Sequence, residues 1–159
     1  FSDCNWINRK KIPDIEEMAV DELLQKSLSI LEKDGLFSEL ILYVNYEYLN
    51  RPEGIFDRLI TKSLNNGLDT VFAAYIDYGH YWYLGKDDVF VQTDESMMSR
   101  SHRTPTYRAL YGIGTVTSSH IVRKGKLVGE KVGIIALENI NTNFRLRELH
   151  GNSFIEAEV

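Results

Sequence analysis

The chain has 159 residues, of which 43% are hydrophobic and 26% are charged, a composition typical of folded domains and far from that of disordered proteins. Its 18 basic and 23 acidic side chains give a net charge of -5, and the bases are scattered, so DNA or RNA binding is not expected. The length suits a single domain, residues 1–159, that needs no disulfide or metal to fold.

The first half of the chain alternates helical and strand patterns. Apolar residues recur at helical spacing from Met18 to Leu31, behind an acidic N-terminal end, which predicts a first helix. Residues 40–44 are a continuous apolar run, typical of a strand covered on both faces. Pro52 suits the first turn of a second helix, which we expect over residues 51–66.

A second strand is expected at residues 69–76. The two strands are separated by about thirty residues with a helix between them, which is the spacing of a right-handed βαβ crossover. We therefore expect an α/β fold of three layers around a mostly parallel, Rossmann-like sheet.

Beyond this unit the pattern changes to a hairpin. Residues 81–84 and 89–91 alternate in character on either side of a turn at residues 85–88, so we expect a hairpin outside the main sheet, in an excursion that spans residues 77–106. Its aromatic side chains are too numerous to be left in water, so they belong either to the core or to an interface. These candidates are Tyr81, Trp82, Tyr83 and Phe90.

Three more elements are expected after the excursion. Residues 110–116 predict a strand whose glycines suggest close approach of another segment. Ser118 and Ser119 are expected to cap a short helix that ends near Gly125, and residues 129–137 predict a last strand.

Several short motifs follow one another along these elements. They are Asn45-Tyr46-Glu47-Tyr48-Leu49-Asn50-Arg51 after the first strand, Phe56-Asp57 in the helix, Asp69-Thr70-Val71 at the second strand, and Pro105, Tyr107-Arg108 and Gly112 after the hairpin. In this order they resemble the C-terminal part of the acylneuraminate and ketodeoxyoctonate cytidylyltransferases. The likeness extends to about Leu137.

The resemblance implies a nucleotidyltransferase-type fold, a homodimer formed through the hairpin, and a protein that couples CTP to a sugar acid with release of pyrophosphate. Mg²⁺ is the implied cofactor of the intact protein. The residues implied to line the sugar side are Asn45, Glu47, Arg51, Tyr107 and Arg108.

Two features of the family are missing. Its glycine-rich, lysine-bearing loop, which holds the triphosphate, has no counterpart here and would lie upstream of Phe1, so we expect the chain to be a C-terminal fragment that is inactive alone. Arg145 and Arg147 stand where the family has the carboxylates that bind Mg²⁺, which leaves Glu138 or Glu148 as candidate metal ligands.

Because the family's triphosphate loop and its Mg²⁺-binding carboxylates have no counterpart here, other functions stay open. A non-catalytic sugar-binding or oligomerisation module would keep the fold without the chemistry. A nucleotidyltransferase that acts on a sugar phosphate is the other alternative, because residues 45–47 differ from the family's segment.

Ordinary structural roles compete with the implied ones. Residues 45–51 follow the end of a buried strand, where open α/β sheets place ligands, but a polar turn into a helix has the same sequence character. A guanidinium such as that of Arg108 pairs carboxylates in a fork, yet base rates favour a surface arginine after a loop. The histidines show no spacing typical of metal ligands.

Cysteine content and hydropathy bear on the location of the protein. Cys4 is the only cysteine, which excludes internal disulfides and fits a reducing compartment. No apolar run approaches the length of about eighteen residues that crosses a bilayer, and no signal peptide is evident. We therefore expect a cytoplasmic protein without membrane attachment.

Overall fold

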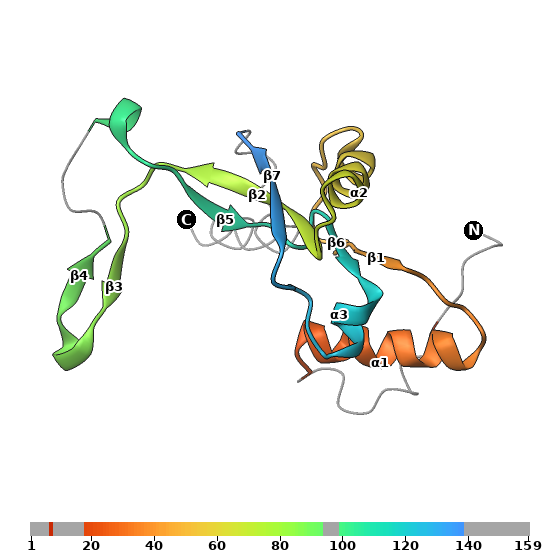
Figure 1. The fold of residues 1–159 in the computed structure, drawn as a ribbon. Coiled ribbons are helices and arrows are strands. Elements are labelled where there is room, and N and C mark those ends of the chain that lie inside the picture. The colour runs from red at the N-terminus through yellow and green to blue at the C-terminus, as the bar shows by residue number, and fades with distance from the viewer. Residues whose placement is uncertain (1–6, 8–17, 94–98, 139–159) are drawn as a thin grey trace, which may run out of the picture.

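The computed structural model describes residues 7, 18–93 and 99–138. These residues form a five-stranded sheet, a separate two-stranded hairpin and three α-helices (Figure 1). The elements are α1 (Val20–Lys33), β1 (Leu40–Tyr43), α2 (Ile55–Asn66), β2 (Thr70–Asp77), β3 (Trp82–Leu84), η2 (Lys86–Asp88), β4 (Phe90–Gln92), η3 (Arg100–His102), β5 (Thr106–Ala109), β6 (Thr115–Ser118), α3 (Ser119–Arg123) and β7 (Val132–Leu137).

The sheet contradicts the expected mostly parallel, Rossmann-like fold. β1 and β2 run in the same direction, but β6 lies between them and pairs antiparallel with both. β5 is antiparallel to the second half of β2, and only β7 pairs with β2 in parallel. The described part of the chain is therefore an α+β fold with a largely antiparallel sheet.

The expected βαβ unit is present, but its two strands are not neighbours. A strand–helix–strand spacing predicts the direction of two strands and does not exclude a third strand between them. Here β6 takes that place, and its two buried threonines are hydrogen-bonded. The Thr117 hydroxyl oxygen lies 3.0 Å from that of Thr70, and the Thr115 hydroxyl donates to the Tyr111 carbonyl at 2.9 Å.

The predicted strand at residues 110–116 is confirmed only at residues 115 and 116, because the preceding residues form a bulge between β5 and β6. Ala73 of β2 accepts a hydrogen bond from the Leu110 N–H and donates one to the Gly114 carbonyl, so the residues between them leave the ladder. β5 begins at Thr106, the last residue of the expected excursion, and β6 begins only at Thr115. We call residues 111–113 the bulge.

The glycines of this region confirm the expected close approach of other segments. A Cβ atom on Gly112 would lie 2.5 Å from the Tyr48 ring and 2.7 Å from the Asn45 Cβ. A Cβ atom on Gly114 would lie 2.8 Å from a methyl group of Leu59, the fully buried residue of α2. The bulge thus contacts the segment that follows β1, and α2 packs directly on the sheet.

The core lies between α2 and one face of the sheet. α2, β2, the bulge, β6 and β7 all contribute apolar side chains to it. Its buried members are Tyr48, Ile55, Leu59, Val71, Ala73, Leu110, Ile113, Val116, Ile135 and Leu137.

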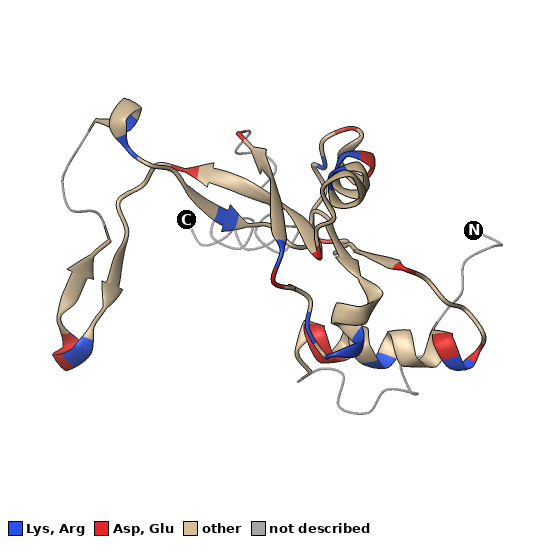
Figure 2. Ribbon diagram, in the orientation of Figure 1, with Lys and Arg blue, Asp and Glu red and all other residues tan. Residues whose placement is uncertain are grey.

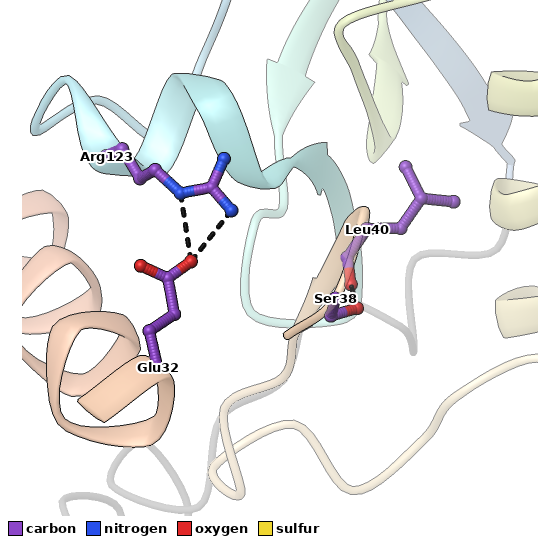
Figure 3. A network of polar contacts seen from close by, with 4 residues as sticks. All are labelled: Glu32, Ser38, Leu40 and Arg123. Carbon is purple, nitrogen blue, oxygen red and sulfur yellow. Dashed lines mark hydrogen bonds and ion pairs between the residues drawn. The ribbon is translucent and has the colours of Figure 1, made fainter. Parts of the chain in front are cut away.

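Helices α1 and α3 pack together at the end of the sheet where β6 finishes. The Arg123 guanidinium donates to one carboxylate oxygen of Glu32 from both Nε and an Nη atom, at 2.9 and 2.7 Å (Figure 3). The Gln25 amide donates to the Arg123 carbonyl, and the Ser38 hydroxyl donates to the Leu40 carbonyl at the start of β1. Ser118 precedes α3, but its side chain makes no cap hydrogen bond, contrary to expectation.

The hairpin of β3 and β4 is confirmed and projects away from the main sheet (Figure 1). The charged residues of its ribbon are confined to the tip, at η2 (Figure 2). Its aromatic side chains are exposed, so they are not part of the core of the described fold. Among the residues that the structure describes, no helix is both long enough and apolar enough to cross a membrane.

Candidate functional site

Two arginines and two tyrosines line a cavity at the C-terminal end of β2, where the hairpin leaves the sheet. The cavity has a volume of about 490 Å³, and β2, the following loop, η3 and the end of β7 contribute to its wall. We call it the arginine pocket. Its lining residues are Tyr75, Ile76, Tyr78, Arg100, Ser101, Arg103, Pro105 and Glu138.

Tyr78 holds both arginines of this pocket. Its backbone carbonyl accepts a hydrogen bond of 2.7 Å from an Nη atom of Arg103. The Arg100 guanidinium lies over its ring, 5.0 Å from the centroid, which is a cation–π contact. Among the described residues of this wall, Glu138 is the only carboxylate, so two positive groups face one negative group there. The pocket therefore favours an anion, although the chain as a whole is acidic.

Asp77 and Tyr81 form a second polar cluster beside this pocket. The Asp77 carboxylate accepts hydrogen bonds from the Tyr81 hydroxyl and from the Gly79 N–H, the latter at 2.7 Å. The hydrogen bond from Tyr81 is the main cause that lowers the pKa of Asp77, and the same bond raises the pKa of Tyr81. Arg108 and Arg100 lower the pKa of Asp77 further through their charge. We call the pair the clasp.

Arg51, an implied sugar-binding residue, is bound to the backbone instead. Its Nε donates to the Ile113 carbonyl at 3.1 Å, and an Nη atom donates to the carbonyls of Asn45 and Gly112. Burial lowers the pKa of Arg51. The guanidinium thus fastens the segment after β1 to the bulge, and its hydrogen-bonding capacity is largely used there.

Asn45 and Glu47 lie in the same segment as Arg51, at the end of β1. The Asn45 side-chain oxygen accepts the Glu47 N–H at 2.9 Å, which makes a local turn. Asn45 also lines a second cavity, of about 500 Å³, together with Tyr48, Tyr111 and Lys126. Three of the five implied sugar-side residues are therefore together, but they do not line the arginine pocket.

Tyr107 and Arg108 lie on β5, where successive side chains point to opposite faces. Arg108 is opposite Tyr75 in the ladder, and its guanidinium lies 5.6 Å from the centroid of that ring. Tyr107 is exposed. Neither side chain lines the arginine pocket, so the structure does not bring this pair together with Asn45, Glu47 and Arg51 around one cavity.

The sequence-based reasoning missed Arg100 and Arg103. Both fall in the polar second half of the expected excursion of residues 77–106, where no site residue was predicted. The available signal was a pair of arginines three positions apart, just before Pro105. In the structure Arg100 begins η3, and Arg103 follows its end in extended backbone.

The candidate metal ligands are not assembled in the described part of the chain. Within residues 18–93 and 99–138, no group of three or more His, Cys, Asp or Glu side chains is placed to hold a metal ion. Glu138 shares its cavity with two arginines, whereas Mg²⁺ prefers several oxygen ligands. Glu148, Arg145, Arg147 and Cys4 lie outside the described residues. We therefore assign no Mg²⁺ ligand among the described residues, and the Mg²⁺ requirement stays a prediction.

Comparison with models of known protein families finds none that matches this chain. Comparison with curated proteins also finds no match.

Proposed function

We propose that this chain forms the sugar-acid side of a cytidylyltransferase-like protein, and that the arginine pocket binds the carboxylate of a sugar acid such as an acylneuraminate. The observation that carries the proposal is the pair of guanidinium groups of Arg100 and Arg103, which faces one cavity and is held there by Tyr78. The order of motifs along the chain supports the choice of family.

The lining of the pocket suits such a ligand. Guanidinium groups bind carboxylates through paired, charge-assisted hydrogen bonds. The Ser101 hydroxyl adds a polar group, and the tyrosine rings offer flat apolar surface to the ring of a sugar. A cavity of about 490 Å³ lies within the ordinary range for small-molecule sites.

In the proposed reaction the anomeric hydroxyl oxygen of the sugar acid attacks the α-phosphorus of CTP. The bond between the α-phosphorus and the bridging oxygen to the β-phosphate breaks, pyrophosphate leaves, and the hydroxyl loses its proton. The described residues bind and orient the acid, and positioning of this kind is a large part of such catalysis. Groups that hold the triphosphate would come from outside the described part of the chain.

Binding of a sugar acid without transfer is the second candidate function. One observation favours it: Arg145 and Arg147 stand where the resembled family has the carboxylates that bind Mg²⁺. A cytoplasmic location and a homodimer formed through the hairpin belong to both versions of the proposal.

Calorimetric titration with N-acetylneuraminate tests the pocket. We expect the wild-type chain to bind it, and Arg100→Gln and Arg103→Gln each to weaken binding by about tenfold or more, because each removes a charged hydrogen-bond donor. Arg58→Gln, on the exposed side of α2, is the matched control. Wild-type affinity in both pocket variants would refute the assignment of the pocket.

Two further ligands and one assay separate the alternatives. The methyl ester of N-acetylneuraminate lacks the negative charge and should bind much more weakly than the acid. Tighter binding of N-acetylglucosamine 1-phosphate than of the acid would favour a sugar-phosphate substrate. In an activity assay, release of pyrophosphate from CTP that depends on the sugar acid supports transfer, and binding without release supports the non-catalytic module.

A further inference from the structure

The loop between β2 and the hairpin is closed by side chains. Asp77 ends β2, and the Tyr81 hydroxyl and the Gly79 N–H both donate to its carboxylate. The Thr106 hydroxyl donates to the Asp77 carbonyl at 3.1 Å, and Thr93 donates to the Tyr81 carbonyl from its N–H and its hydroxyl, both at 2.9 Å. The clasp thus ties both ends of the loop at residues 78–80 to one another.

Tyr78 is the first residue of this closed loop, and it is the residue that positions both arginines of the pocket. Its carbonyl holds Arg103 and its ring lies under Arg100. Any loosening of the loop would move the carbonyl and the ring together, and both guanidinium groups would lose a contact.

We infer that Tyr81 is a positioning residue for the arginine pocket, because its hydroxyl closes the loop onto Asp77 and so fixes Tyr78 between Arg100 and Arg103. Tyr81 itself does not line the pocket. The consequence for ligand affinity rests on the proposed function, whereas the effect on the arginines is measurable without any ligand. A binding site whose charged groups are held in place loses less entropy when the ligand binds.

The test is Tyr81→Phe, which keeps the ring and removes the hydroxyl. Tyr83→Phe is the matched control, since it removes the same atom two residues further along, in exposed β3. We expect Tyr81→Phe to increase the mobility of the Arg103 side chain, measured by ¹⁵N relaxation of its Nε. The Gly79 amide should exchange with solvent about three- to tenfold faster. Affinity for N-acetylneuraminate should fall about three- to tenfold.

Each outcome decides a separate claim. Unchanged Arg103 mobility and unchanged Gly79 exchange in Tyr81→Phe would overturn the inference, whatever the ligand does. If the wild-type chain does not bind the acid, the proposed function fails, and the two ligand-free readouts still decide the role of the clasp. Asp77→Asn keeps an acceptor oxygen for both donors and should lie between the wild type and Tyr81→Phe. This second variant gives the answer should Tyr81→Phe fail to fold.

Discussion

Arg51 is a residue whose sequence position suggested ligand binding and whose contacts indicate a structural role. Three carbonyl groups, those of Asn45, Gly112 and Ile113, share its guanidinium. Hydrogen bonds to a charged group contribute more than neutral ones, and removal of the donor leaves the carbonyls without that partner in a partly buried place.

We therefore predict that Arg51→Ala lowers the free energy of unfolding by about 2 to 3 kcal/mol, as measured by urea denaturation. Arg58→Ala, on the exposed face of α2, should leave it nearly unchanged. A variant that keeps its stability and loses only affinity for a sugar acid would restore the ligand role that the motif implied.

Asp69 is a second residue with a structural role, at the start of β2. Its carboxylate accepts the N–H groups of Lys131 and Glu130 at 3.0 and 3.1 Å. The hydrogen bond from Lys131 is the main cause that lowers the pKa of Asp69 below its ordinary value of 3.8, and the nearby charges of His120 and Lys131 act in the same direction.

A lowered pKa in the folded state means that the ionised form of Asp69 stabilises the fold. This contribution is complete above the ordinary value of 3.8 and is lost as the pH falls through the lowered folded-state pKa. We predict that Asp69→Asn flattens the acid limb of a plot of unfolding free energy against pH. Asp57→Asn, exposed on α2, should leave the limb as steep as in the wild type. An equally steep limb in Asp69→Asn would contradict the prediction.

At the scale of elements, an ion pair joins α3 to α1, and its contribution to stability can be measured at different salt concentrations. Arg123 and Glu32 make a double contact, but 46% and 20% of their side-chain surface is exposed (Figure 3). Exposed ion pairs contribute between about 0.2 and 1 kcal/mol.

Arg123→Gln should therefore lower the free energy of unfolding by about 0.5 kcal/mol at low ionic strength. The difference should shrink in about 1 M salt, where charges are screened within about 3 Å. Lys26→Gln is a suitable control, because its partner Glu22 lies in α1 itself and that pair does not join two elements. Urea denaturation at two salt concentrations measures both effects, and a loss that does not depend on salt would point to packing.

Most elements were predictable from the sequence, but their arrangement was not. Apolar runs located β1, β2 and β7, and turn residues located the hairpin, because local periodicity reflects burial on one or two faces. The insertion of β6 between β1 and β2 depends on contacts between residues more than seventy positions apart, as with Ile41 and Thr117, which no local pattern encodes. The apolar residues around Gly112 predicted a strand because they are buried in the core, but they reach the core from a bulge.

The candidate site was predictable only in part. The polar residues that follow β1 can be read from the sequence, but the role of Arg51 depends on where the bulge lies. Arg100 and Arg103 contact Tyr78 only because η3 lies against the loop that follows β2. Such convergence is a tertiary property, and a polar loop with two arginines looks ordinary along the chain.

At the scale of the whole molecule, the hairpin is the feature that the described fold leaves unexplained. A two-stranded hairpin is marginally stable in water by itself. Trp82, Leu84 and Phe90 lie on one face of it, and Tyr83 and Val91 lie on the other, all exposed by 39% to 67%. Because only the tip carries charge, nothing on its flanks opposes contact with another apolar surface (Figure 2).

We predict that two copies of the chain associate through this hairpin. Trp82→Ser combined with Phe90→Ser should convert a dimer into a monomer without unfolding the main sheet, because neither side chain belongs to the core. Sedimentation equilibrium measures the mass, and far-ultraviolet circular dichroism monitors the fold. Leu64→Ser, at an equally exposed apolar residue of α2, should leave the dimer intact. A wild-type monomer at micromolar concentrations, or a dimer that survives the double substitution, would exclude the hairpin as the interface.

The same association should stabilise the hairpin itself, because a second copy would cover its exposed apolar surface. Loss of the dimer should therefore make the amide protons of β3 and β4 exchange with solvent faster.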